Sequence, residues 1–570
     1  MTERWRARPA GAEALIAALE TEGVEYLFGI PGVHTLLPFD LLHDHPTIRP
    51  IITRHESGAG FAADGYARAS GKPGVCLVVP GPGATNLATA ALVARSDRVP
   101  LVLIAAAVPA ALLGRAAIHE LDLDAFFAPL VKGRVAVSSP TLNAVATAVA
   151  RAFALAQAEP PGPVQLAFPY DLFGWRDSGL ATRVALAVPR APDLTPRLPE
   201  RAVLEWALAT LREAKSPLIY AGHGVVRAEA GAALLTLAEV LGAPVMTSNK
   251  ARGVIPEDHP LAAGIPSMAG AAALAREADV CLALGTRFNE YTTLTWQLPL
   301  PRRLIRVDRD LNVLSQNYPA EIALAGDVGA VLAWLLERLP ARPQRLPSPA
   351  VSATTALRER RVTSLDRFMF ASSDAAPPFH PRFVARTLRE LLPPNAIFVS
   401  DGSATESWLY EPGFTITRPD SLFVPEIQQT MGYAPGAALG AALGAPGRPV
   451  VAVVGDGSLT MALGELAAIA AARVPLTIVV FNDGAYNALR VRQEAVYDGR
   501  YVGTQLGPLD FAQLARGVGL RGERIIFAEQ LRRRLREALT QKEPLLLDVP
   551  IAPEPLSERY TAVIEATQHD

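Results

Sequence analysis

Short apolar runs alternate along the chain with longer stretches rich in alanine and leucine. Eight of these runs have the length and composition of buried strands. They are GVCLVV (74–79), VPLVLIAA (99–106), SPLIYA (216–221), ADVCLAL (278–284), NAIFVS (395–400), RPVVAVV (448–454), PLTIVVF (475–481) and PLLLDVP (544–550). Nearly continuous apolar runs are typical of parallel strands covered on both faces. The pattern therefore predicts an α/β fold built from parallel sheets.

Two proline-rich stretches interrupt this pattern. Residues 188–200 (VPRAPDLTPRLPE) and 339–350 (LPARPQRLPSPA) hold too many prolines for a regular helix or strand. The blocks that they separate, residues 1–185, 195–340 and 375–560, are similar in size and pattern and predict three doubly wound parallel-sheet domains. Such sheets bind ligands outside the carboxyl ends of their strands, so the residues after each apolar run are the first candidates for a site.

Composition narrows the classes of partner. The 570 residues include 54 Lys+Arg and 56 Asp+Glu, a formal net charge of −2, and we expect no nucleic acid partner because no basic excess can neutralise phosphates. The two cysteines lie inside apolar runs, which excludes a disulfide framework and a zinc site. The longest apolar stretch is broken by Pro109 and is too short to span a bilayer. We expect no membrane partner and a cytoplasmic location.

Two acidic strand ends in the third block predict a metal site. Asp456 lies in GDGS (455–458) after one apolar run, and Asp483 lies in NDG (482–484) after the next. Their spacing, 483 − 456 = 27, fits one strand-helix-strand unit, whose crossover returns both strand ends to the same sheet edge. Glycines let backbone N–H groups approach a diphosphate, and carboxylate oxygens suit Mg²⁺. An isolated GDGS is also a common turn, so the prediction depends on the pair of acids.

These motifs have a known counterpart. GDGS followed by NDG, together with FGIPG (28–32) and RHESGAGFAADGYARASG (54–71), resembles the thiamine diphosphate enzymes of the acetolactate synthase and 2-oxo acid decarboxylase group. The resemblance covers nearly the whole chain and implies a pyrimidine-binding domain (1–185), a middle domain (195–340) and a diphosphate-binding domain (375–560). It also implies that Asp456, Asp483 and the backbone carbonyl of Ala485 ligate Mg²⁺. The family more often has Asn at position 483, so this site carries one extra negative charge.

The resemblance extends to the residues around the cofactor. Met431, in QQTMGYAPG (428–436), matches a position where a large apolar side chain props the cofactor in its bent shape, although methionine also commonly fills core gaps. The implied cofactor-binding residues are Ser403, Ala404, Thr405, Met431, Gly455, Asp456, Gly457, Ser458, Asp483, Ala485, Tyr486 and Asn487.

Glu56 is the predicted catalytic acid. It follows the predicted apolar strand IRPIIT (48–53) and opens a helix whose first turns are small residues. From the residues alone, a helix-start carboxylate stabilised by the helix dipole explains Glu56 equally well. The resemblance implies that Glu56 hydrogen-bonds the aminopyrimidine ring of thiamine diphosphate and promotes loss of the thiazolium C2 proton. The family holds that ring in one subunit and the diphosphate in another, so we expect a homodimer or homotetramer with active sites between chains.

Two histidines are further catalytic candidates. His34 lies in PGVHT (31–35) and His119 in AIHEL (117–121), a pairing that looks most like guanidino-oxopentanoate decarboxylase and its relatives. Either imidazole can relay protons near neutral pH or orient a substrate carboxylate. Capping or surface roles explain both residues equally well.

Several positions depart from acetolactate synthase. Ala107 stands where that enzyme has Gln, Ile118 and His119 stand where it has Phe-Gln, and Arg492 stands where it has Trp. These changes weaken the case for acetolactate formation. The middle block resembles the segments that hold FAD in that enzyme, but GHG (222–224) lacks the third glycine of a dinucleotide loop. An empty middle domain is the expectation, with FAD as the alternative.

The sequence therefore predicts an enzyme that uses thiamine diphosphate and Mg²⁺ to decarboxylate a small-molecule 2-oxo acid, with release of an aldehyde or carboligation to a second carbonyl. Acetolactate synthase proper, acting on pyruvate, is one alternative. A lyase for 2-hydroxyacyl or oxalyl coenzyme A is another. A catalytically silent member that binds thiamine diphosphate in a regulatory or structural role is the alternative outside the enzymes.

Overall fold

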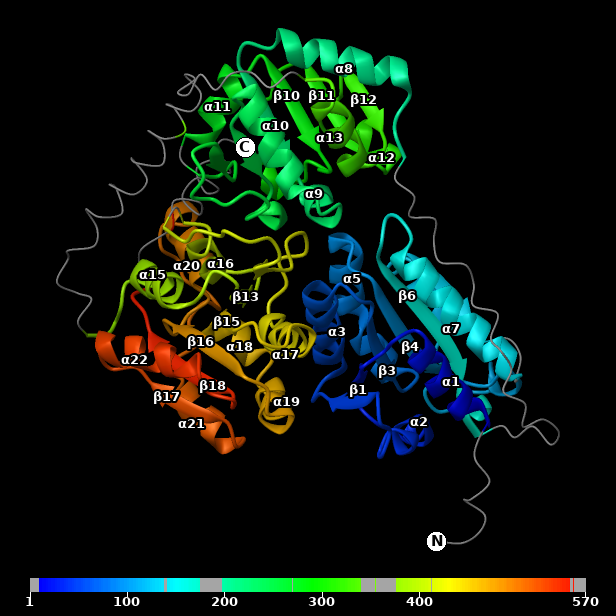
Figure 1. The fold of residues 1–570 in the computed structure, drawn as a ribbon. Coiled ribbons are helices and arrows are strands. Elements are labelled where there is room, and N and C mark those ends of the chain that lie inside the picture. Colours follow the sequence, from blue (N-terminus) through cyan, green and yellow to red (C-terminus); the bar gives the residue numbers. More distant parts are fainter. Residues whose placement is uncertain are drawn as a thin grey trace, which may run out of the picture.

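The computed structural model describes residues 10–137, 141–174, 197–268, 270–339, 354, 376–411, 413–553 and 557. Each of the eight apolar runs forms a strand, and the strands lie in three six-stranded parallel sheets. The predicted fold class is confirmed. The domain limits expected from the proline-rich stretches, at residues 185, 195, 340, 375 and 560, lie outside the described residues. Figure 1 shows the three domains, with the middle domain above the other two.

The first sheet has the strand order β2-β1-β3-β4-β6-β5. Helices α1 (Ala10–Thr21) and α7 (Leu142–Gln157) cover one face, and α3 (Glu56–Ser70) and α5 (Ala88–Asp97) cover the other. The strands are β1 (Tyr26–Gly29), β2 (Arg49–Ile52), β3 (Gly74–Val78), β4 (Leu101–Ala107), β5 (Gly133–Ala136) and β6 (Pro163–Pro169).

The third sheet repeats this order as β14-β13-β15-β16-β18-β17. Its strands are β13 (Ile397–Ser400), β14 (Leu422–Phe423), β15 (Val450–Gly455), β16 (Leu476–Asn482), β17 (Arg521–Arg524) and β18 (Leu545–Pro550). Helices α17 (Ala434–Gly444), α19 (Gly464–Ala472) and α21 (Phe511–Gly517) cover the face toward the first domain. Helices α15 (Pro381–Leu391) and α22 (Ala528–Ala538) cover the outer face. The two sheets thus share one topology.

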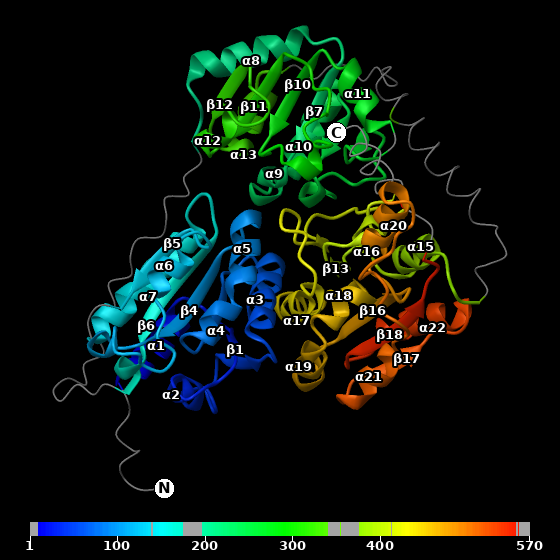
Figure 2. The same ribbon diagram turned by 180° about the vertical axis from the view of Figure 1, so that it is seen from behind.

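The middle sheet differs, with the order β12-β11-β10-β7-β8-β9. When these six strands are numbered 1 to 6 in chain order and the sheet is read from β9 to β12, the order is 3-2-1-4-5-6. This is the strand order of dinucleotide-binding folds. The strands are β7 (Pro217–Ala221), β8 (Val245–Thr247), β9 (Ala262–Gly264), β10 (Val280–Leu284), β11 (Leu304–Asp308) and β12 (Ile322–Ala325). Helices α8 (Arg201–Glu213), α10 (Gly231–Leu241) and α13 (Val328–Leu336) pack on one face, as Figure 2 shows from behind.

Helices α3 and α17 join the first and third domains along one line of contact (Figure 1). A methyl group on Gly65 would lie 1.9 Å from the carbonyl oxygen of Ala437, and one on Gly440 would lie 1.8 Å from that of Ala62. Only glycine permits backbones to approach this closely. One hydrophobic core therefore runs from the first sheet through both helices to the third sheet.

None of the helices within the described ranges combines the length and apolar character needed to cross a bilayer.

Candidate functional site

A cavity of about 290 Å³ opens at the carboxyl edge of the third sheet. It lies where the strand order reverses between β13 and β15, the position at which such sheets bind ligands. Every residue predicted to bind the cofactor lines this cavity: Ser403, Ala404, Thr405, Met431, Gly455, Asp456, Gly457, Ser458, Asp483, Ala485, Tyr486 and Asn487. These residues follow the ends of three adjacent strands, β13, β15 and β16, or lie in the turn before α17.

Asp456 and Asp483 lie at neighbouring strand tips, because β15 pairs with β16 up to Gly455 and Phe481. Asp456 Oδ2 accepts a hydrogen bond from the Gly484 N–H at 2.6 Å, which links the two tips. Burial raises the pKa of Asp456 to about 6. Burial and the nearby Asp456 charge raise the pKa of Asp483 to about 7. Two buried carboxylates that disfavour each other's charge are a suitable place for a cation.

The same edge has features that favour the binding of an anionic ligand. Gly457 lines the cavity, and a methyl group there would lie 2.5 Å from the ring of Tyr486, so glycine is what allows Tyr486 to pack at this position. The helices α16 (Ala404–Trp408) and α18 (Asp456–Thr460) both begin at the cavity, and their first N–H groups favour negative charge. Among the described residues no three His, Cys, Asp or Glu side chains converge. A cation here would therefore take its remaining oxygens from the backbone and from a bound ligand, as Mg²⁺ commonly does.

Asp401 stands behind this cavity and was not predicted. It is fully buried after β13, and its Oδ1 accepts a hydrogen bond from the Ala434 N–H at 2.6 Å. Burial raises its pKa to about 7. The contact fixes the start of α17, and with it the turn that carries Met431, against the end of β13.

Glu56 lies at the carboxyl edge of the first sheet, at the start of α3. Asn86 donates a hydrogen bond from Nδ2 to Glu56 Oε2 at 2.9 Å. A methyl group on Gly83 would lie 3.3 Å from Glu56 Oε1, so the turn after β3 closely borders the carboxylate. The sequence motifs do not point to Asn86, although it follows the apolar run 74–79 and so lies where parallel sheets bind ligands.

His34 and His119 lie together at this edge. Their ring centroids are 5.0 Å apart, and the Tyr170 ring lies 4.7 Å from that of His34. The Nδ1 atom of each histidine is buried without a hydrogen-bond partner in the described structure. Burial and the neighbouring His119 lower the pKa of His34. His119 has a φ of 63°, and the Gly81 position abuts its backbone; non-glycine residues held in this conformation are often found at functional sites.

The two edges do not form one site within a single chain. The cavity of the third sheet is lined, among the described residues, only by residues between 291 and 551. Glu56, His34 and His119 all belong to the first domain. The structure thus brings together the predicted diphosphate and metal residues, and separately the predicted proton-transfer residues.

A second cavity, of about 430 Å³, opens at the carboxyl edge of the middle sheet beside β7 and β10. Gly222, Gly224 and Gly285 border it, and its lining includes charged side chains of both signs. Among these, burial and the nearby Arg98 lower the pKa of Arg287, so a bound anionic group would offset the cost of burying that cation.

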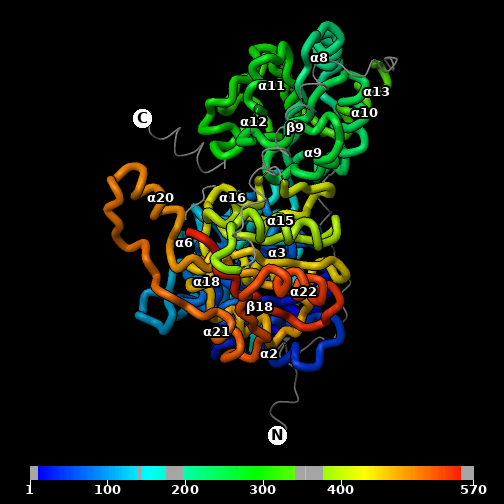
Figure 3. Tube along the Cα trace, turned by 90° about the vertical axis from the view of Figure 1, so that its left-hand side faces the viewer, coloured from blue at the N-terminus to red at the C-terminus, as the bar shows by residue number. Residues whose placement is uncertain are grey.

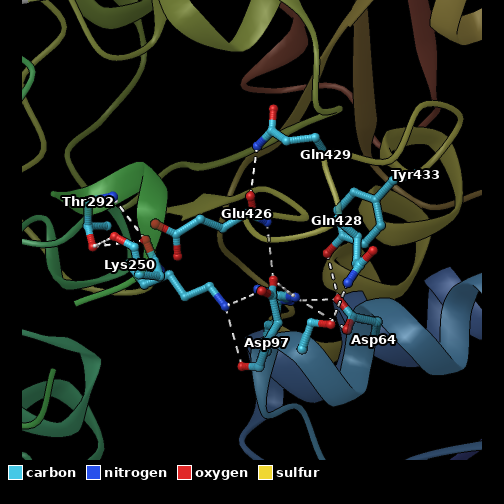
Figure 4. Close-up of polar contacts among 11 residues, drawn as sticks. Asp64, Asp97, Lys250, Thr292, Glu426, Gln428, Gln429 and Tyr433 are labelled. Carbon is cyan, nitrogen blue, oxygen red and sulfur yellow. Dashed lines mark hydrogen bonds and ion pairs between the residues drawn. The ribbon is translucent and has the colours of Figure 1, made fainter. Parts of the chain in front are cut away.

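A buried polar network connects this second cavity to the other two domains (Figure 4). Lys250 of the middle domain pairs with Asp97 of the first domain at 2.7 Å. Arg68 bridges Asp97 and Asp64, and Tyr433 of the third domain donates to Asp64 Oδ1 at 2.6 Å. Buried charges are retained when they are paired in this way, so the network fixes how the three domains meet.

Comparison with known proteins places all three domains in one family. Residues 9–126 match the thiamine pyrophosphate enzyme N-terminal TPP binding domain, residues 204–335 the central domain, and residues 401–549 the C-terminal TPP binding domain. A probable acetolactate synthase large subunit of Methanocaldococcus jannaschii is 33% identical over 95% of this chain and 92% of its own length. A probable 2-ketoarginine decarboxylase of Pseudomonas aeruginosa is 36% identical over 94% of this chain and 93% of its own.

An acetolactate synthase large subunit of Corynebacterium glutamicum is also similar, at 34% identity over 92% of this chain and 84% of its own length.

Proposed function

Because the chain belongs to the thiamine pyrophosphate enzyme family, we propose that it decarboxylates a 2-oxo acid with bound thiamine diphosphate and Mg²⁺. The acyl unit that remains is released as an aldehyde or joined to a second carbonyl compound. The observation that carries this proposal is that Asp456, Asp483 and the glycine-rich segment 455–457 line one cavity at the carboxyl edge of the third sheet.

The residues of the third-domain cavity fit the cofactor. Asp456, Asp483 and the carbonyl of Ala485 would hold Mg²⁺, which offsets the charge that burial disfavours on both acids. The backbone at Gly457 and the start of α16 would hold the diphosphate. When bound, thiamine diphosphate supplies a carbon nucleophile and then an electron sink for the carbanion left by CO₂ loss.

The first-domain edge would supply proton transfer. Glu56, oriented by Asn86, would hold a proton at the aminopyrimidine ring. His34 and His119, whose buried Nδ1 atoms have no partner among the described residues, would contact the substrate carboxylate or carry a proton to the product. Burial keeps His34 neutral to a lower pH than usual, which suits a proton acceptor near neutrality.

We further propose that a second copy of the chain completes each site. Glu56 and the third-domain cavity lie in different parts of one chain, so a homodimer that pairs the first domain of one protomer with the third domain of its partner would bring them together. Helix α20 (Asn487–Val496) projects from the body beside the cavity (Figure 3), and its Leu489 and Val496 are exposed. Contact with a partner would cover this apolar surface.

Turnover on a panel of 2-oxo acids tests the activity. Purified protein with thiamine diphosphate and Mg²⁺ should release CO₂ from at least one member of a panel that includes pyruvate and 2-ketoarginine. Acetoin after acid treatment of a pyruvate reaction would favour acetolactate synthase proper. Cleavage of oxalyl or 2-hydroxyacyl coenzyme A instead would favour the lyase alternative. Cofactor binding, seen as a higher melting temperature, without turnover on any of these compounds would favour the silent alternative.

The middle domain supports a second ligand proposal. Its strand order and the cavity beside β7 and β10 favour a bound nucleotide over the empty domain expected from the sequence, with FAD as the candidate. Arg287 would face its diphosphate. The absorption spectrum of the protein as purified, and of the supernatant after heat denaturation, would reveal a flavin. A colourless protein that takes up no added FAD in a calorimetric titration would overturn this proposal.

A further inference from the structure

One buried acid in the third domain touches the chain segment that leads into Glu56. Glu465 lies in the first turn of α19 and is 2% exposed. Its Oε1 accepts hydrogen bonds from the backbone N–H groups of Arg54 at 3.0 Å and His55 at 2.9 Å. These two residues immediately precede Glu56 and belong to the first domain. The contact therefore crosses the boundary between domains and ends one residue from the predicted catalytic acid.

The fit around Glu465 is tight. A methyl group on Gly58 would lie 2.4 Å from the Glu465 carboxylate, and one on Gly464 would lie 3.1 Å from Arg54 Cβ. The first turn of α3 and the start of α19 thus meet with no room for another side chain. Because hydrogen bonds to a carboxylate are stronger than those to a neutral acceptor, Glu465 holds the entry of α3 in one place.

The other oxygen of Glu465 is unusual. Oε2 is buried and has no hydrogen-bond partner within the described structure, and burial raises the pKa of the group to about 7. A leucine or methionine at this position would fill the same space without that cost. The presence of an acid at this position is better explained by the two hydrogen bonds that it accepts than by packing.

Glu465 is also linked to the diphosphate cavity of its own domain. Helix α18 begins at Asp456, and α19 begins after a short turn at Gly464. Asp456 is therefore joined to Glu465 through α18 and the turn before α19, and Glu465 contacts the residues before Glu56. Glu56 does not line the cavity of its own chain.

We propose that Glu465 is a positioning residue that sets the orientation of Glu56 in its own chain, and that it thereby acts on the active site completed by the partner subunit. This inference rests on the proposed function, because it requires that Glu56 assists a cofactor bound by the other protomer. Each chain would then couple the cofactor-binding half of one site to the proton-transfer half of the other.

The first test separates positioning from a merely structural role. Glu465→Ala should lower both kcat and the exchange of the cofactor's C2 hydrogen with solvent deuterium by at least about tenfold, since small displacements of a catalytic group are costly. The Kd for thiamine diphosphate should change by less than about threefold, and Glu465→Gln, which keeps an acceptor oxygen, should recover most of the exchange rate. Exchange measured on acid-quenched enzyme by NMR reports on the step that Glu56 assists.

Glu257→Ala is the matched control. Glu257 is also a largely buried acid, with 9% of its side chain exposed. Its Oε2 accepts a hydrogen bond across a domain boundary from the Ile416 N–H at 2.7 Å, and within the described structure its hydrogen bonds and ion pairs do not involve the residues before Glu56. This variant should lose stability while its cofactor-loaded sites keep the wild-type exchange rate. Wild-type exchange in Glu465→Ala, or loss of exchange only in proportion to cofactor loss, would overturn the proposal.

A mixed dimer tests which site Glu465 serves. Co-expressed chains with different tags would carry Glu465→Ala in one copy and Asp456→Ala in the other. If Glu465 acts through Glu56, both defects fall on the same active site, and the other site is intact, so activity should return to about half of the wild-type value. If Glu465 instead supports the cavity of its own chain, both sites are damaged and the mixed dimer stays inactive, which would overturn the proposal.

A second mixed dimer, Glu56→Ala with Asp456→Ala, identifies the cause of any failure. Recovery of about half the activity here, with no recovery in the Glu465 pair, would reject the role of Glu465 alone. No recovery in either pair would show that active sites do not lie between chains, which would reject the proposed assembly on which the inference rests.

Discussion

The first and third sheets have the same strand order, yet their carboxyl edges differ in chemistry. The third-sheet edge gathers buried acids and glycines around a cavity, which suits a metal ion and a diphosphate. The first-sheet edge gathers Glu56, Asn86 and two histidines, which suit proton transfer. Topology therefore sets where a site forms, and the residues after the strands set what the site does. Under the proposed function, neither edge alone would be a complete active site.

Asp456→Ala should have the largest effect, because it removes the acid that links both strand tips of the third edge. We expect loss of Mg²⁺ and thiamine diphosphate binding together, and a fall in turnover of more than about a thousandfold at ordinary cofactor concentrations. Calorimetric titration with thiamine diphosphate and Mg²⁺ measures the binding. Asp483→Asn is the control and should keep binding, since an amide oxygen can replace the carboxylate; unchanged affinity in Asp456→Ala would contradict the metal assignment.

Glu56→Ala should distinguish the role of the first-sheet edge in turnover from the role of the third-sheet edge in cofactor binding. We expect turnover to fall about a hundredfold to ten-thousandfold, the range for loss of a general acid or base, while cofactor affinity stays within a few-fold of wild type. Asn86→Ala should show a smaller loss, because it leaves the carboxylate in place but removes the hydrogen bond that orients it. Near-normal turnover in Glu56→Ala would show that this carboxylate only begins a helix.

His119→Ala should change the pH dependence of the rate. Because His119 lowers the pKa of His34, its removal should let the His34 pKa rise, so that activity falls at a higher pH on the acid side. The rate at neutral pH should drop by about tenfold to a hundredfold, with cofactor affinity unchanged. A pH profile of kcat/KM identical to that of wild type would return His119 to a structural role.

The smallest effect concerns stability without metal. Burial raises the pKa of Asp483 from 3.8 to about 7, so the folded state binds this proton more tightly than the unfolded chain does. Stability is then greatest below about pH 4 for this group and is lost as pH rises toward 7. In EDTA, the melting temperature of wild type should fall as the pH rises from 5 to 7.5. The melting temperature of Asp483→Asn should fall by about 1 to 3 °C less over the same range.

An exposed acid provides the control for that experiment. Asp124, in α6 (Leu123–Phe127), has a side chain that is 75% exposed, and Asp124→Asn should follow the wild-type pH dependence. If Asp483→Asn also followed it, the buried carboxylate would not be the source of the effect.

Eight inner strands were predictable from sequence because they are covered on both faces and read as continuous apolar runs. The inner strands β1, β6, β8 and β11 lie outside those eight runs. The edge strands β5, β12 and β17 were not predictable: they mix buried and exposed positions over four residues each, so their pattern is too short to distinguish from loops. The strand order of the middle sheet also depends on pairings that no local pattern encodes.

Some site residues could likewise be inferred from the sequence, and others could not. Asp456 and Asp483 follow apolar runs within one strand-helix-strand unit, so their proximity could be inferred from spacing. Asp401 directly follows the apolar run 395–400 and could be found by the same reasoning. Glu465 could not, because its role arises from a contact with a segment distant in the sequence. Glu465 meets Arg54 across about four hundred residues, and such contacts depend on how the domains pack.

The glycine contact between α3 and α17 limits how this protein can be recombined. Since Gly65 and Gly440 sit against each other's helix backbones, the surfaces of the two domains are matched at the level of main-chain atoms. In a chimera whose first domain carried a bulkier residue at position 65, or whose third domain carried one at position 440, α3 and α17 could not pack this closely. Successful domain exchange would need to take both helices, α3 and α17, from the same parent protein.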